Sequence, residues 1–165
     1  MAKKPVQFTL NGSPTAVFVD GGANLLDVLR RGVGDLTPKY GCGQGTCGTC
    51  TVIIDGEPHL GCLTLAETIE GRTVETTGGL GNGADLHPLQ KEFMEGFAAQ
   101  CGYCTPGMLM SAKSLLDKNP NPTRDEVVEA ISGNICRCTG YDSIIEAILR
   151  AASQTSSNSS QGRAF

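Results

Sequence analysis

The amino-acid sequence predicts an α+β fold in two parts, a sheet domain followed by a helical domain. Three observations predict it. In the first half, short stretches alternate apolar with polar residues, which is typical of strands that bury one face. Beyond a glycine-rich stretch at residues 78–84, apolar residues recur with helical spacing. The 8 cysteines of the 165 residues fall into two groups of four, one in each half.

The first half, residues 1–77, reads as strands around one short helix. Strands are expected at residues 6–10, 15–19, 51–54 and 73–76. Asn11-Gly12 and Asp55-Gly56 are tight-turn signals that follow two of them. Asn24 is a candidate N-cap for the helix. A loop rich in glycine and cysteine separates this helix from the third strand. This order predicts a ferredoxin-like β-grasp domain.

The second half, residues 85–152, reads as a four-helix bundle, and residues 78–84 as the linker before it. Helices are expected from Pro88 toward Phe97, from Pro106 to Leu116, from a Thr123–Glu126 capping box to Ile131, and from Asp142 through Leu149. The cysteines of this half lie at helix ends, where free backbone N–H groups can face a metal centre. Residues 153–165 are rich in Ser, Gln and Asn, and we expect a disordered tail there.

Composition and charge exclude several classes of function. The net charge of −4 and the pI of about 5.1 argue against nucleic acid or an anionic membrane as the partner. No apolar run approaches the roughly 20 residues of a membrane span. The N-terminus has no apolar signal segment, so we expect a cytoplasmic protein, with export alongside a signal-bearing partner left open. In a reducing cytosol, eight cysteines are not expected to form disulfides.

The spacing of the cysteines points to metal centres. The first set is Cys42, Cys47, Cys50 and Cys62, which spells C-x4-C-x2-C followed by a fourth cysteine. This is the plant-type [2Fe–2S] pattern, with a fourth ligand that comes sooner than in plant ferredoxins. The second set is Cys101, Cys104, Cys136 and Cys138. Zinc is usually held by C-x2-C pairs, and only half of the eight cysteines have that spacing. Structural zinc and disulfides remain the alternatives.

Other candidate site residues are few. His59 and His87 are the 2 histidines of the chain. Without paired Cys-x-His motifs they do not suggest a Rieske centre, and we interpret both as surface residues. No acid–base pair or nucleophile constellation is recognisable. We therefore expect this chain alone to perform no bond chemistry.

Three signatures carry a resemblance to a known family. They are the segments at residues 41–52 (GCGQGTCGTCTV), 100–108 (QCGYCTPGM) and 133–141 (GNICRCTGY). Together they resemble the small iron–sulfur subunit of the xanthine oxidase family of molybdenum hydroxylases. The likeness covers about residues 5–152. One departure is Gly48-Thr49, where many members of the family have Gly-Ala.

The resemblance implies an electron-transfer subunit with two [2Fe–2S] clusters. It implies a large subunit that carries molybdopterin, often as the cytosine dinucleotide. A medium FAD subunit or a cytochrome would then be the electron acceptor. By this analogy the second cysteine set holds the cluster near the pterin, and the first set holds the outer cluster. Gln100 would hydrogen-bond the pterin, and Cys138 would be both a ligand and the bridge toward it. The sequence at residues 40–45 (YGCGQG) resembles that of family members that act on nitrogen heterocycles.

Two other functions compete with this interpretation. A free-standing two-cluster ferredoxin would carry electrons without being part of an enzyme, and it would have no use for Gln100 or for a face matched to a large subunit. A zinc-stapled interaction module would be colourless, whereas [2Fe–2S] proteins are red-brown. Substrate, final acceptor and cluster potentials lie outside what these residues specify.

Overall fold

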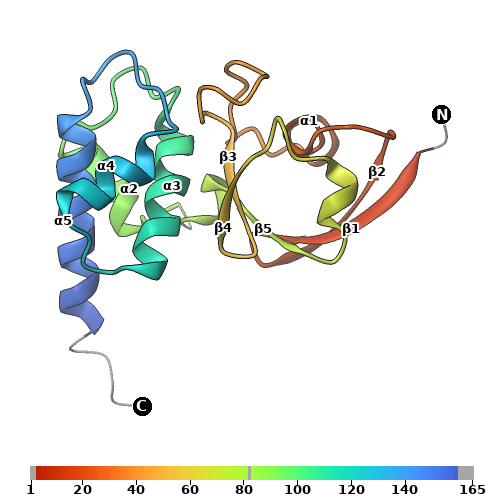
Figure 1. Cartoon of the computed structure of the whole chain (residues 1–165). Helices are drawn as coiled ribbons and strands as arrows, with labels where there is room; N and C mark the ends of the chain where they lie inside the picture. The colour runs from red at the N-terminus through yellow and green to blue at the C-terminus, as the bar shows by residue number, and fades with distance from the viewer. Residues whose placement is uncertain (1–2, 82, 160–165) are drawn as a thin grey trace.

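A mixed five-stranded sheet forms the first domain of the computed structural model, which describes residues 3–81 and 83–159 (Figure 1). Its strands are β1 (Lys4–Leu10), β2 (Ser13–Val19), β3 (Thr51–Ile54), β4 (Glu57–Leu60) and β5 (Thr73–Glu75). They lie in the order β2-β1-β5-β3-β4, with β1 and β5 parallel and the other neighbours antiparallel. The ferredoxin-like sheet domain is confirmed.

Strand β4 is absent from the sequence prediction. Its four residues, Glu-Pro-His-Leu, lack apolar alternation, and Pro58 argues against a strand. The structure places β4 at the edge of the sheet, where only β3 pairs with it. A proline is tolerated there because one side of an edge strand donates no ladder hydrogen bonds.

Short helical turns close the sheet domain. Helix α1 (Leu25–Asp27) continues as the wider turn η1 (Val28–Val33). Asn24 caps α1 as expected, since its Oδ1 accepts a hydrogen bond of 2.8 Å from the amide of Asp27. Two further turns are η2 (Ala66–Ile69) and η3 (Thr77–Gly79). The buried core between them and the sheet consists of Val6, Phe8, Leu10, Val19, Leu25, Val28, Leu29, Val52, Ile54, Ala66, Ile69 and Val74.

Four packed helices form the second domain, as the apolar spacing predicts. They are α2 (Pro88–Glu95), α3 (Thr105–Lys118), α4 (Arg124–Ile131) and α5 (Asp142–Ser159). The Thr123–Glu126 capping box begins α4. Around a core that includes Leu89, Met108 and Ile148, α5 packs on α2 and α4.

The end of the chain departs from the expected disordered tail. Helix α5 continues from residue 153 to Ser159 instead of ending near residue 152. Once a helix is nucleated and packed, adding residues costs little, and Ser, Gln and Asn lower its stability only slightly. Residues 1 and 2, Asn82 of the expected linker and residues 160–165 of the expected tail lie outside the described residues.

Helix α3 joins the two domains. It packs against β3, whose four residues are all buried. Two lysines of α3 pair with carboxylates of the sheet domain: Lys113 Nζ lies 3.1 Å from Glu75 Oε2, and Lys118 Nζ lies 2.6 Å from Glu57 Oε2. In Figure 1 the loop before β3 and the loops before α3 and α5 lie at the same end of the molecule. Among the described helices, none is long and apolar enough to cross a membrane.

Candidate metal centres

The first cysteine set lies where the sheet domain turns toward the helices. Cys42 and Cys47 are half-buried in the loop before β3, Cys50 is buried at the end of that loop, and Cys62 follows β4. The loop winds tightly because Gly43, Gly45 and Gly48 have φ of 67°, 81° and 66°. Side chains rarely adopt this left-handed backbone, which is why glycine occupies these positions.

Backbone amides face the sulfur of Cys42. The amide of Gln44 donates to Cys42 Sγ at 3.4 Å, and the amide of Thr46 donates at 3.3 Å. Hydrogen bonds from Thr46, from Gln44 and from the Cys47 thiol lower the pKa of Cys42 to about 5. A thiolate is the form of cysteine that binds metals, so this site is prepared for ligation.

The pKa of Cys50, the buried cysteine of this set, shifts in the opposite direction. Burial raises the pKa of the Cys50 thiol to about 11, and the neighbouring thiols of Cys62 and Cys47 contribute to the rise. A thiol in this position loses its proton only when a cation replaces it. Cys42 therefore neighbours Cys47, and Cys50 neighbours Cys62, which makes two sulfur pairs.

The second set has the same paired arrangement. Cys101 and Cys104 lie just before α3, with Cys104 as its N-cap, and Cys136 and Cys138 lie between α4 and α5. The sulfurs of Cys101 and Cys138 are 3.7 Å apart. Burial, followed by a hydrogen bond with Cys136, raises the pKa of Cys104 to about 12. A cavity of about 150 Å³ is lined by all four of these cysteines.

The donor chemistry of both sets fits clusters. All eight cysteines are free thiols. Two sulfur pairs in each set offer one pair to each iron of a two-iron cluster, which takes four thiolates. The residues present therefore fit a [2Fe–2S] group at each set.

The two cysteine-bearing loops touch through polar contacts. The amide of Ile135 donates to the carbonyl oxygen of Cys47 at 2.9 Å. The Tyr103 hydroxyl donates to the carbonyl oxygen of Tyr40 at 2.7 Å. Buried Asn134 donates from Nδ2 to the carbonyl oxygen of Gly48 at 2.9 Å. These contacts are absent from the sequence prediction, because residues so far apart along the chain show no periodicity or spacing that relates them.

Glycines permit this close approach. A Cβ added at Gly48 would lie 2.4 Å from the carbonyl oxygen of Gly133. A Cβ added at Gly107 would lie 2.3 Å from the carbonyl oxygen of Gly48. No side chain fits at either position without moving the backbone, so the cysteine loops are in direct main-chain contact.

Comparison with known proteins identifies the family. Residues 8–77 match the 2Fe-2S iron-sulfur cluster binding domain, and residues 73–149 match the [2Fe-2S] binding domain. The chain is 48% identical over 149 residues to the nicotine 6-hydroxylase small subunit of Paenarthrobacter nicotinovorans, covering 90% of each chain. It is 45% identical over 148 residues to the nicotinate dehydrogenase small FeS subunit of Eubacterium barkeri, covering 90% of this chain and 94% of that one.

The chain belongs to the small [2Fe–2S] subunits of the molybdenum hydroxylases. It is the electron-transfer subunit of such an oxidoreductase complex, as the three signatures predict. A solved structure agrees: quinoline 2-oxidoreductase from Pseudomonas putida contains a chain that superimposes with a TM-score of 0.91 at 46% identity. That match covers 96% of this chain and 98% of the other.

The remaining site residues of this small subunit lie around the second set. Gln100 is exposed and directly precedes Cys101, and Cys138 is exposed as well. His87 is not a free surface residue: its Nδ1 accepts the amide hydrogen of Leu89 at 3.2 Å and caps α2. Burial lowers the pKa of His87 below 6.5, and the positive charge of Lys113 adds to this. His59 lies half-buried in β4.

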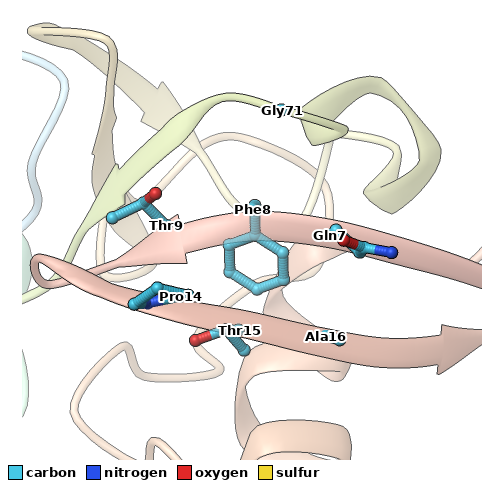
Figure 2. Close-up of a pocket in the computed structure, with 7 residues that line it drawn as sticks. All are labelled: Gln7, Phe8, Thr9, Pro14, Thr15, Ala16 and Gly71. Atoms are coloured by element: carbon cyan, nitrogen blue, oxygen red, sulfur yellow. The ribbon is translucent and has the colours of Figure 1, made fainter.

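A hollow on the sheet domain lies away from the cysteines, and no cysteine or titratable side chain lines it. It has a volume of about 320 Å³ and is lined by Gln7, Phe8, Thr9, Pro14, Thr15, Ala16 and Gly71. Figure 2 shows these residues along the paired strands β1 and β2, with Gly71 on a neighbouring loop. The small subunit therefore has its candidate chemistry at the cysteines.

Proposed function

We propose that Cys42, Cys47, Cys50 and Cys62 hold one [2Fe–2S] cluster, and that Cys101, Cys104, Cys136 and Cys138 hold the other. The observation that carries the proposal is the pairing of sulfurs within each set, with the two sets in adjoining loops. A bound cluster supplies one-electron chemistry, and the chain supplies its ligands and surroundings.

Hydrogen-bond donors around the sulfurs support the assignment. Four thiolates give such a site a negative charge, which N–H and O–H donors stabilise. The amides of Gln44 and Thr46 face Cys42, and the Thr139 hydroxyl donates to Cys136 Sγ at 3.1 Å. The hydrogen bond from Ile135 to Cys47 supplies a short connection from one set of ligands to the other.

We infer that the second set faces the large subunit. The exposure of Gln100, Cys101 and Cys138 supports this inference, because a cofactor held by another chain can reach only exposed groups. Gln100 would hydrogen-bond a molybdopterin, expected as the cytosine dinucleotide, and Cys138 would be the ligand nearest to it. The loop of Cys42 would then face the acceptor, either the FAD of a medium subunit or a cytochrome.

The names of relatives support a substrate class. Nicotine, nicotinate and quinoline are all nitrogen-containing heteroaromatic compounds. We propose that the complex containing this chain hydroxylates a ring carbon of an N-heteroaromatic substrate, in the pocket of its large subunit. We also propose a cytoplasmic location, supported by eight free thiols, which the cytosol keeps reduced.

Metal analysis of the purified complex tests the assignment. Two clusters predict four irons and four acid-labile sulfides per chain, with molybdenum in the same fraction. Electron paramagnetic resonance (EPR) of the reduced complex should show two distinct signals. Cys50→Ser should remove one signal and Cys104→Ser the other. Zinc without sulfide would overturn the proposal, and so would loss of the same signal in both variants. Hydroxylation of an aldehyde but of no N-heteroaromatic would overturn the substrate class alone.

A further inference from the structure

Thr49 makes a contact that the ligand assignment does not use. Its Oγ1 donates a hydrogen bond to Cys47 Sγ at 3.2 Å. Thr49 is only 4% exposed, so water does not replace its hydroxyl as the donor to this sulfur. Thr49 is also where the sequence departs from the Gly-Ala pair of many related subunits, and alanine has no hydroxyl to donate.

The surroundings hold the Thr49 side chain in place. A Cβ at Gly41 would lie 3.0 Å from Thr49 Oγ1 and 3.3 Å from its Cβ. On the other side, a Cβ at Gly107 would lie 3.1 Å from Thr49 Cα. The carbonyl oxygen of Thr49 accepts from the amide of Lys39 at 3.3 Å. With glycines on both sides and its backbone tied, the hydroxyl has a fixed position beside the sulfur.

Thr49 also lies between the two cysteine sets. It lines the cavity that the four cysteines of the second set surround, although it belongs to the loop of the first set. Its hydroxyl, however, bonds to a sulfur of the first set. Its electrostatic effect should therefore fall mainly on the first set.

We propose that the Thr49 hydroxyl raises the reduction potential of the cluster held by the first cysteine set. Reduction adds one electron, and so one negative charge, to a group that is already anionic. A hydrogen bond to a ligand sulfur stabilises the more negative form more strongly, which favours reduction. Thr49 is thus a positioning residue that acts through Cys47. The inference rests on the proposed function, since it requires a cluster at Cys47.

The test is a redox titration of the whole complex, monitored by EPR. Thr49→Val removes the hydroxyl and keeps a similar shape. We expect a lower midpoint potential for the first cluster and a much smaller change for the second. Thr49→Ser keeps a hydroxyl and should keep the wild-type potential. Thr49→Ala is smaller than threonine and cannot clash, so it replaces the valine variant if that variant fails to assemble. It should also lower the midpoint potential of the first cluster.

Two matched variants separate tuning from general disturbance of the loops. Thr51→Val removes a buried hydroxyl that bonds to the carbonyl oxygen of Gly48 at 2.6 Å and not to sulfur, so neither potential should move. Thr139→Val removes the donor to Cys136 Sγ and should lower the potential of the second cluster instead.

Each outcome decides one question. An unchanged first potential in a fully loaded Thr49→Val or Thr49→Ala complex would overturn the tuning role. A shift of equal size in Thr51→Val would overturn it too, because the effect would then come from loop packing. Absence of the first signal from the wild-type complex would instead refute the cluster assignment, and iron and sulfide analysis of the same sample would show this separately.

Discussion

The amide of Ile135 donates a hydrogen bond of 2.9 Å to the carbonyl oxygen of Cys47, and this bond ties the helical domain to the loop of the first cysteine set. Each partner lies beside or within a cysteine set, since Ile135 directly precedes Cys136. The two domains therefore meet through main-chain groups at the cysteines themselves. Side chains that disturb this contact should affect both domains.

Gly107→Ala should destabilise the protein although it lies in a helix. An alanine in a helix is normally more stable than a glycine by roughly 0.5–1 kcal/mol. Here the added Cβ would lie 2.3 Å from the carbonyl oxygen of Gly48, and overpacking of this kind costs about 1–3 kcal/mol. The free energy of unfolding, measured by urea titration with far-UV circular dichroism, should fall.

Gly133→Ala is the matched control for this change. It lies in the neighbouring loop, and a Cβ there would have no atom within 4 Å. It should leave the free energy of unfolding close to that of the wild type. Equal stabilities of the two variants would contradict the close main-chain contact.

Asn134→Ala should weaken the attachment of the two domains. Asn134 is 4% exposed; its Oδ1 accepts from Ser111 Oγ at 2.7 Å, and its Nδ2 donates to the carbonyl oxygen of Gly48. Removing it leaves buried polar partners unsatisfied, which costs about 1–3 kcal/mol. Asn119→Ala, which removes a solvent-exposed hydrogen bond to Glu126 just after α3, serves as the control. The same urea titration should show a clearly larger loss for Asn134, and equal losses would refute its role.

His87 should make stability fall in mildly acidic solution. Burial, reinforced by Lys113 and opposed by Asp117, lowers its pKa in the folded protein below 6.5. The folded state thus favours the neutral ring, whose Nδ1 accepts the Leu89 amide. The contribution of His87 to the free energy of unfolding is complete above the pKa of the unfolded state, about 6.5. It is lost as the pH falls through the lower pKa of the folded state.

The variant His87→Asn isolates this contribution. Asparagine is a good N-cap and does not titrate. The melting temperature of the wild type should decrease relative to that of the variant as the pH is lowered from 7 to 5. If the difference in melting temperature between the wild type and the variant stays constant from pH 7 to 5, His87 does not titrate in the way its burial implies.

Local patterns account for most of the elements. The capping box at Thr123 begins α4, and the Asn24 cap begins α1, because these signals act within a few residues of the chain. Strand β4 shows no such local pattern. Its pairing with β3 and its place at the edge of the sheet stabilise it although it contains Pro58. The extension of α5 to Ser159 likewise depends on the packed turns that precede it.

The spacing of the cysteines and the residues around them predict two [2Fe–2S] domains and the family, and both predictions are confirmed, because these local patterns reflect the chemistry of the ligands directly. The pairing of the sulfurs, the amides and hydroxyls that face them, and the contact between the two loops depend on the tertiary structure. Residues such as Thr49, Gly107 and Asn134 acquire these roles through contacts between distant segments. Such contacts depend on the packing of α3 against the sheet, which brings together backbone groups that no local pattern relates.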